Sequence, residues 1–124
     1  MQINSWNCRG LGNLAKVEAV KDLLKMYPSD FLLLQETKIE EDSILSISKS
    51  KWKKNVGLVV SSRGSYGGMA TIWSEDIFHL KNSFRTQQWI YSELYHISSN
   101  LSIYLINLYV LVYYVEKKFV GSLC

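Results

Sequence analysis

Two polar residues at the ends of apolar stretches are the first candidates for chemistry in this sequence. The stretch LLLQETK (Leu32 to Lys38) passes from leucines directly into Glu36 without a turn residue, and Asn7 follows the stretch QINSW near the N-terminus. A carboxylate and an amide are hard oxygen donors of the kind that Mg²⁺ binds. Glu36 is therefore either a metal ligand or a solvated charge at a strand end, and Asn7 either assists it or closes a turn.

The elements that would position these two residues form a strand–helix–strand unit. QINSW predicts a short strand, and Asn13 fits the N-cap of a helix that Pro28 stops. The run DFLLLQ (Asp30 to Gln35) is too uniformly apolar for a surface strand and predicts a central strand covered on both faces. The apolar face of the helix is predicted from helical spacing to comprise Leu14, Val17, Ala19, Val20, Leu23 and Leu24.

The crossover between the two strands is expected to be right-handed, so the strands are expected to be parallel. Their carboxyl ends then emerge at one edge of the sheet, which is where open sheets of this kind bind ligands. We therefore expect Asn7 and Glu36 side by side at that edge.

The remaining sequence changes character and predicts antiparallel strands. Lys38 to Lys49 predicts a second helix, with Ile39, Ile44, Leu45 and Ile47 as its apolar positions. NVGLVVSS and GMATIW flank RGSYG as a predicted hairpin. Three further strands are expected at Ile77–Phe84, Trp89–Ile97 and Ser102–Val112. An α/β fold with a mixed sheet follows from this order of elements.

Composition limits the chain to one globular domain. It has 124 residues, of which 48% are hydrophobic and 20% charged, with a net charge of +3 that permits contact with a polyanion without requiring it. No basic region precedes an apolar run at the N-terminus, so no signal peptide is predicted, and an intracellular place in nucleus or cytoplasm is expected. The apolar run from Leu101 to Val115 is too short for a membrane-spanning helix, so no membrane contact is expected.

Several motifs together resemble a known superfamily. INSWNCRGLGN, PSDFLLLQETK, RGSYGGMATIW and INLYV occur in the order typical of the endonuclease/exonuclease/phosphatase superfamily, and the sequence is most similar to the endonuclease domain of plant LINE-type retrotransposons. The resemblance implies a deoxyribonuclease I-like α/β sandwich, truncated to about its first half. It also implies phosphodiester cleavage in DNA with Mg²⁺ or Mn²⁺.

The resemblance carries roles to five residues. Glu36 is similar in position to the metal-binding glutamate, Asn7 to the asparagine that organises metal and phosphate, and Tyr109 to a tyrosine that contacts the scissile phosphate. Arg9 and Lys38 would contact substrate, although Arg9 stands where the apurinic enzymes have aspartate. The residues alone leave simpler interpretations open, because Tyr109 lies in an apolar strand and Lys38 is also an ordinary surface residue.

The departures from the superfamily predict an incomplete domain. Gly-Asp-Phe-Asn and Ser-Asp-His motifs do not occur, and the only acidic residue after Tyr109 is Glu116. We expect a partial domain at 1–115 and a tail at 116–124, catalytically incompetent alone. The alternative is a non-catalytic remnant that binds metal or nucleic acid, so enzyme activity stays open. Self-association is expected through an exposed apolar strand with Leu105, Leu108, Val110 and Val112 on its surface.

Overall fold

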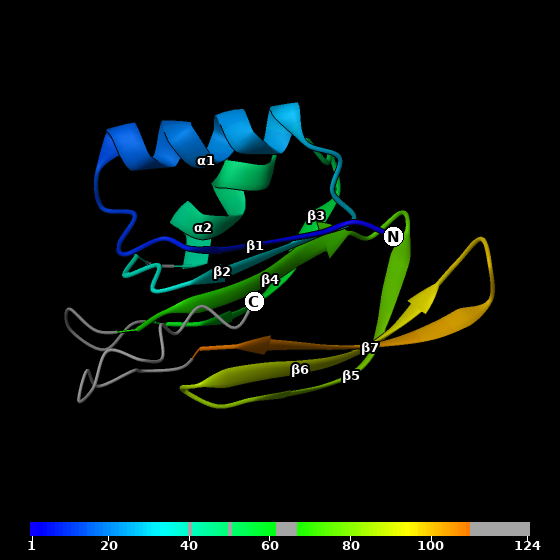
Figure 1. Cartoon of the computed structure of the whole chain (residues 1–124). Coiled ribbons are helices and arrows are strands. Elements are labelled where there is room, and N and C mark those ends of the chain that lie inside the picture. The colour runs from blue at the N-terminus through cyan, green and yellow to red at the C-terminus, as the bar shows by residue number, and fades with distance from the viewer. Residues whose placement is uncertain (40, 50, 62–66, 110–124) are drawn as a thin grey trace, which may run out of the picture.

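The protein is a sandwich of two β-sheets with two helices on one outer face (Figure 1). The computed structural model describes residues 1–39, 41–49, 51–61 and 67–109. A four-stranded sheet has the order β1-β2-β4-β3, and a three-stranded sheet has the order β5-β6-β7. Both helices lie on the side of the four-stranded sheet that faces away from the three-stranded sheet. The predicted deoxyribonuclease I-like α/β sandwich is confirmed.

The first three elements form the predicted strand–helix–strand unit. β1 (Ile3–Asn7) and β2 (Phe31–Gln35) are parallel, and α1 (Leu14–Met26) connects them. The Asn13 side chain caps α1 by accepting hydrogen bonds from the backbone N–H groups of Ala15 and Lys16, as predicted. The helix ends before Pro28, because proline has no N–H and clashes with the preceding turn.

β2 is buried along its whole length and separates two hydrophobic cores. Leu32 and Leu34 face the helices, whereas Phe31 and Leu33 face the three-stranded sheet. This alternation is the pleat of a strand that is covered on both faces. The central position predicted for this run is confirmed.

The second helix and the next two strands complete the four-stranded sheet. α2 (Glu41–Ser48) starts later than predicted and packs on the sheet through Ile44 and Ile47. β3 (Asn55–Val60) and β4 (Met69–Ser74) are antiparallel, which confirms the hairpin pairing, while residues 62–66 of its turn lie outside the described residues. β4 inserts between β2 and β3, so the sheet is mixed as predicted.

The last three strands form the second sheet as an antiparallel meander. β5 (Phe78–Arg85), β6 (Trp89–His96) and β7 (Leu101–Leu108) follow one another along the chain. Asn100 ends the tight turn between β6 and β7 with a left-handed backbone, φ +58°. Residues 110–112, which were predicted to extend the last strand, lie outside the described residues.

Two predictions of surface and core positions are wrong. Leu14 was expected on the buried face of α1, but as the first residue of the helix it is 76% exposed. Ala19 is exposed as well. Leu105 was expected on an exposed apolar surface, but it is 8% exposed and packs in the core between the sheets. The exposed apolar residues of β7 include Leu108, as predicted, together with Tyr104 and Ile106.

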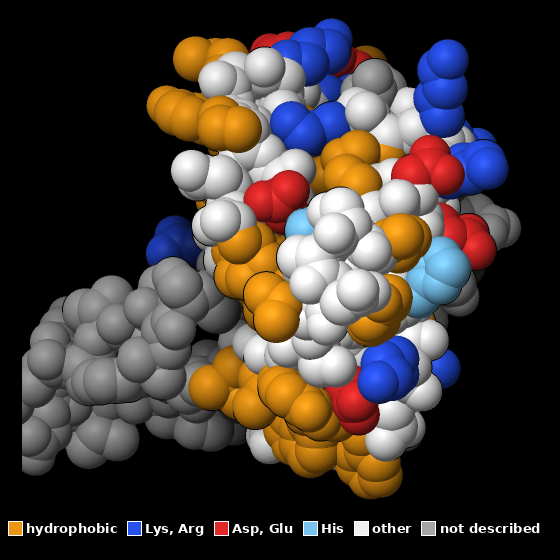
Figure 2. All heavy atoms as spheres, turned by 90° about the vertical axis from the view of Figure 1, so that its right-hand side faces the viewer, with side chains coloured by type: hydrophobic (Ala, Val, Ile, Leu, Met, Phe, Trp, Pro, Cys, Tyr) orange, Lys and Arg blue, Asp and Glu red, His pale blue; other side chains and the backbone are white. Residues whose placement is uncertain are grey.

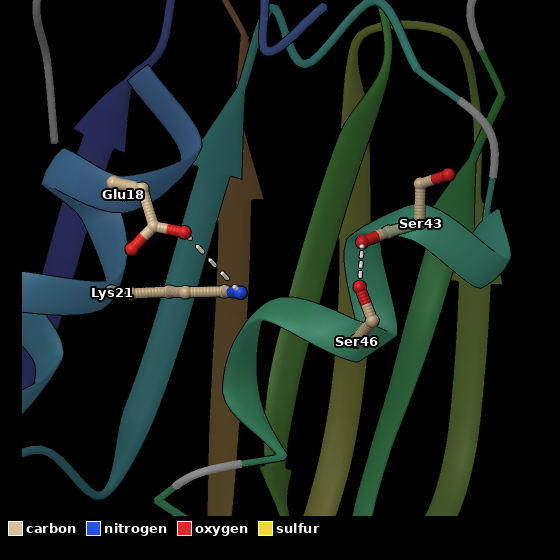
Figure 3. Close-up of polar contacts among 4 residues, drawn as sticks. All are labelled: Glu18, Lys21, Ser43 and Ser46. Carbon is tan, nitrogen blue, oxygen red and sulfur yellow. Dashed lines mark hydrogen bonds and ion pairs between the residues drawn. The ribbon is translucent and has the colours of Figure 1, made fainter. Parts of the chain in front are cut away.

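The outer surface of the three-stranded sheet carries a cluster of hydrophobic side chains. Figure 2 shows hydrophobic side chains gathered at the lower end of the visible face, where Figure 1 places the three-stranded sheet. The helical layer carries short-range polar contacts, such as the Lys21–Glu18 ion pair at 3.8 Å and the Ser46 hydroxyl bonded to the Ser43 carbonyl at 2.7 Å (Figure 3).

No helix among the described residues is long and apolar enough to cross a membrane.

Gly57 in β3 allows α2 to approach the sheet closely, and a substitution there tests this packing. A Cβ at position 57 would lie 2.9 Å from Leu45 Cδ2 and 3.2 Å from the Thr71 carbonyl oxygen. We expect Gly57→Ala to lower the free energy of unfolding by about 1–3 kcal/mol, measured by urea denaturation. Gly12→Ala is the matched control, because nothing lies within 4 Å of its added Cβ. Equal stability of the two variants would contradict this account of the packing.

Candidate functional site

The carboxyl ends of β1 and β2 bring the two predicted site residues to one edge of the sheet. Asn7 is the last residue of β1 rather than the residue after it, and it lies opposite Gln35 in β2. Glu36 follows Gln35 directly. The structure therefore confirms that Asn7 and Glu36 lie at the same end of the parallel pair.

The backbone leaves the strand conformation at this edge at three residues other than glycine, in addition to Gly10 with φ +95°. Arg9, Glu36 and Lys38 all have left-handed backbones, with φ of 51°, 51° and 54°. Each such residue costs on the order of 1–3 kcal/mol and persists only where its surroundings hold it. No turn residue follows LLLQ because the change of direction is made at Glu36 itself.

Hydrogen bonds from two loops hold this strained segment. The Glu36 and Thr37 carbonyl oxygens accept from the backbone N–H groups of Gly10 and Leu11, at 2.7 and 2.8 Å. On the other side, the N–H groups of Thr37 and Lys38 donate to the carbonyl oxygens of Gly68 and Gly67, both at 3.1 Å. The segment after β2 is thus fixed between the loop before α1 and the residues before β4.

The left-handed turn at Glu36 decides which side its carboxylate faces. Along a regular strand, Glu36 would point toward the helices, since Gln35 points toward the second sheet. Instead, Glu36 Oε1 accepts a hydrogen bond from the hydroxyl of Tyr109 at 2.7 Å, and Tyr109 packs against the core between the sheets. The two residues are 73 positions apart in the chain. This hydrogen bond therefore crosses the boundary between the two sheets (the seam), because Glu36 follows β2 of the four-stranded sheet and Tyr109 follows β7 of the three-stranded sheet.

Two hydrogen bonds fix Tyr109, one from its backbone and one from its side chain. Its backbone N–H donates to the Gln88 carbonyl oxygen at 2.7 Å, and its hydroxyl donates to Glu36. Burial, the hydrogen bond to Glu36 and the negative charge of that carboxylate raise the pKa of Tyr109 to about 12. The phenol therefore stays protonated at neutral pH and acts as a hydrogen-bond donor at this edge.

The other predicted site residues lie around the same edge. Asn7 is exposed, and its Oδ1 accepts from the backbone N–H of Arg9 at 3.2 Å, so it closes a turn as the simpler interpretation proposed. Arg9 and Lys38 are both exposed. Lys38 lies over Gly10, where a Cβ would come within 3.3 Å of its Cδ. The two cations are therefore available to a ligand at the edge.

Cys8 lies between Asn7 and Arg9 but differs from them chemically. Its side chain is partly buried against the core beneath the helices. Burial raises the pKa of the Cys8 thiol to about 11. The thiol is therefore protonated at neutral pH and is not a nucleophile, since the thiolate is the reactive form.

A buried amide pair directly behind Glu36 was missed by the sequence interpretation. Gln35 Nε2 donates to Asn107 Oδ1 at 2.8 Å and to the Ser5 hydroxyl at 3.0 Å. Asn107 is fully buried, and its Nδ2 donates to the Ala70 carbonyl oxygen at 2.8 Å. A signal was present in the sequence, because Asn107 is the lone amide in the apolar run YLINLYV. A buried polar residue of this kind needs partners.

The donor set at the edge suits part of a magnesium or manganese site. Glu36 offers a carboxylate oxygen beyond the one bound by Tyr109, and Asn7 offers an amide oxygen. Both are hard donors, and Mg²⁺ keeps several water ligands when few protein ligands are present. Within the described ranges, no group of three histidine, cysteine, aspartate or glutamate residues converges to hold a metal.

The fold and the site together define a class of protein. Two β-sheets packed face to face, with helices outside and an acidic residue and amide at the carboxyl ends of a parallel strand pair, form a layered α/β sandwich with an oxygen-rich edge. The sequence matches the model of the endonuclease/exonuclease/phosphatase family over residues 5–113. The chain belongs to that family.

Solved structures of similar fold support the assignment of the architecture. The AP endonuclease LMAP from Leishmania major is 19% identical, with a TM-score of 0.62, over 88% of this chain and 40% of that chain. The mannosyl-6-phosphatase Bt3783 from Bacteroides thetaiotaomicron is 10% identical, with a TM-score of 0.60, over 84% and 49%. A humanized TDP2 from D. rerio is 17% identical, with a TM-score of 0.58, over 84% and 47%.

The chain therefore spans less than half the length of these structures. No protein among the curated sequences matches it.

The contact between Tyr109 and Glu36 can be tested through the ionisation of the phenol. We expect Glu36→Gln to lower the pKa of Tyr109 from about 12 toward its usual value of 10, because the charge and the strong acceptor are lost while burial remains. Titration of Tyr109 by NMR of ¹³Cζ-labelled tyrosine measures the change.

The sign of the pH effect on stability follows from the raised pKa. The contribution of Tyr109 to the free energy of unfolding is complete below pH 10 and is lost as the pH rises to about 12, since the unfolded chain ionises first. A pKa of Tyr109 that does not change in Glu36→Gln would contradict the contact.

Proposed function

We propose that this chain carries the metal-binding and phosphate-facing edge of a nucleic-acid phosphodiesterase. The observation that supports this most directly is the hydrogen bond from Tyr109 to Glu36 across the seam of the sandwich. It supports a common site for two residues that the family resemblance connects with metal and phosphate. Asn7 lies at the same edge, and Arg9 and Lys38 supply positive charge next to it.

Each residue has a distinct role in the proposed site. Glu36 and Asn7 would hold Mg²⁺ or Mn²⁺, and a bound metal of this kind polarises a phosphoryl oxygen and stabilises a leaving oxygen. Tyr109 fixes the orientation of the carboxylate with its single hydroxyl hydrogen, and it would donate to a phosphate oxygen only by moving that hydrogen from Glu36 to the phosphate. Arg9 and Lys38 would attract the backbone of DNA, because phosphate contacts dominate the affinity for nucleic acids.

The chain by itself is proposed to be catalytically incompetent. Hydrolysis requires a group that activates water, and such a general base typically contributes 10²- to 10⁴-fold. The motifs that would supply it, together with a second carboxylate, are absent from the sequence. We interpret residues 1–115 as the first half of a domain of retroelement origin, with 116–124 as a tail. Its length relative to the solved structures supports this interpretation.

A groove between the edge strands of the two sheets supports self-association. A groove of about 700 Å³ lies between β1 and β7, the outermost strands of the two sheets on that side, and Trp6, Leu33 and Leu105 contribute to its apolar lining. β7 carries no charged residue to discourage pairing. We propose that two copies associate through this side, in an intracellular compartment, nucleus or cytoplasm, where DNA is the partner of the site.

A second candidate function is binding without catalysis. The retained carboxylate, amide and cations at the edge favour it over loss of all function. In this case the chain binds metal or nucleic acid weakly and cleaves neither DNA nor RNA. Cleavage that depends on Glu36 would exclude this second candidate, because it assigns no catalysis to the site.

Metal binding tests the proposed site directly. We expect Mn²⁺ to bind with a dissociation constant on the order of 1 mM, because one carboxylate and one amide displace few waters from the ion. Paramagnetic broadening of amide NMR signals should centre on Asn7 and Glu36 and disappear in Glu36→Gln. Glu75→Gln is the matched control, since Glu75 follows β4 directly at the opposite end of the sheet. Broadening that survives Glu36→Gln would contradict the site.

Cleavage tests the proposed incompetence. We expect no nicking of supercoiled plasmid or abasic duplex above background in Mg²⁺ or Mn²⁺, because the general base and second carboxylate are missing. Agarose gels measure the nicked fraction, and Glu36→Gln prepared in parallel controls for contaminating nucleases. Nicking by the unchanged chain that vanishes in Glu36→Gln would show that this half, alone or as a dimer, is catalytic.

A further inference from the structure

A fully buried asparagine connects the two sheets directly behind the candidate site. Asn107 lies in β7 of the three-stranded sheet, but its side chain bonds to groups of the four-stranded sheet. Its Oδ1 accepts from Gln35, and its Nδ2 donates to the Ala70 carbonyl oxygen at 2.8 Å and the Thr71 hydroxyl at 3.3 Å. Each polar atom of the amide therefore has a partner, which offsets the cost of burying it.

These hydrogen bonds can form in one register only. A shift of β7 by one residue would turn Asn107 to the outer face of the sheet, and a shift by two would place Leu105 or Tyr109 opposite Gln35. Either shift would leave the buried amide of Gln35, which is 3% exposed, without this acceptor. Apolar contacts between sheets tolerate sliding better, because they have no direction. The amide contacts thus select the position of β7 along β2 and β4.

The position of β7 determines whether Tyr109 reaches Glu36. Tyr109 lies two residues beyond Asn107 and faces the same side of the strand. Glu36 lies one residue beyond Gln35 and is turned to that side by its left-handed backbone. The Gln35–Asn107 and Tyr109–Glu36 hydrogen bonds, at 2.8 and 2.7 Å, are therefore consecutive links across the same seam.

We propose that Asn107 is a positioning residue of the site, which sets the register of β7 so that the Tyr109 hydroxyl meets the Glu36 carboxylate. Its effect on metal binding rests on the function proposed above, whereas its effect on the Tyr109–Glu36 contact does not. Asn107 acts through Tyr109 and itself touches neither metal nor substrate.

The test replaces the amide by an apolar side chain of similar size in the full chain. Asn107→Leu is expected to lower the pKa of Tyr109 from about 12 toward 10, measured by NMR of ¹³Cζ-labelled tyrosine, because the phenol loses its bond to the carboxylate. Ser92→Ala is the matched control. Ser92 is a fully buried polar residue of the neighbouring strand β6, and its hydroxyl donates to the Leu105 carbonyl oxygen within the same sheet.

The control separates positioning from general destabilisation. Ser92→Ala removes a buried hydrogen bond inside the three-stranded sheet and leaves the hydrogen bonds of Asn107 to the four-stranded sheet in place, so the pKa of Tyr109 should stay at about 12. A folded Asn107→Leu with an unchanged pKa of Tyr109 would overturn the proposal, as would an equal fall in both variants. If Asn107→Leu does not fold, Gln35→Met decides, because it removes the amide that donates to Asn107 Oδ1 and keeps an unbranched side chain of similar length. A fall in pKa supports the proposal, and an unchanged pKa overturns it.

Mn²⁺ titration of the same samples distinguishes this inference from the proposed function. Weaker Mn²⁺ binding in Asn107→Leu, together with the lower pKa of Tyr109, supports both. If the unchanged chain binds no Mn²⁺ but the pKa of Tyr109 still falls in Asn107→Leu, the positioning role stands and the metal site fails. If Mn²⁺ binds and the pKa does not move, the metal site stands and the positioning role fails.

Discussion

The arrangement of the whole molecule depends on burying one strand, β2, on both faces. Phe31 and Leu33 contact the second sheet while Leu32 and Leu34 contact the helices, so both layers must align with the same five residues. Buried apolar area of this kind is the main favourable term in folding. Because every layer meets at β2, the residues that follow it are positioned by all three layers at once. Gln35 and Glu36 are therefore both fixed by hydrogen bonds to residues on the side of the second sheet, Asn107 and Tyr109.

The left-handed backbones at this edge of the sheet lower the stability of the fold, so stability alone does not explain their presence. Three non-glycine residues, Arg9, Glu36 and Lys38, keep left-handed backbones within one small region. Such conformations collect at functional sites, where surrounding contacts hold them. At this edge the contacts are backbone hydrogen bonds in which Gly10 and Leu11 donate and Gly67 and Gly68 accept. The result is a carboxylate turned from the helical face to the seam between the sheets, where it meets Tyr109.

Sequence periodicity was sufficient for local elements and for the edge of the parallel pair. It predicted α1 with its Asn13 cap, the buried strand β2 and the common edge of Asn7 and Glu36, because each rests on local spacing or on the handedness of one crossover. It placed Leu105 wrongly because β7 is apolar on both faces, so that alternation cannot distinguish inside from outside. The partner of Asn107 lies 72 positions away, and no local pattern contains that contact.

The candidate site lies between the two sheets, so its geometry depends on how the sheets pack against each other. A site built within one sheet would survive small displacements of the other sheet. Here Glu36 follows β2 of the four-stranded sheet and Tyr109 follows β7 of the three-stranded sheet. Their hydrogen bond therefore forms only when the two sheets are correctly placed relative to each other. Most of the core between the sheets is apolar and does not define that position by itself. The hydrogen bonds of Asn107 to Gln35 and Ala70 are directional, and they lie in the buried part of the seam next to Glu36. They therefore fix the relative position of the two sheets at the place where the Glu36 carboxylate meets Tyr109.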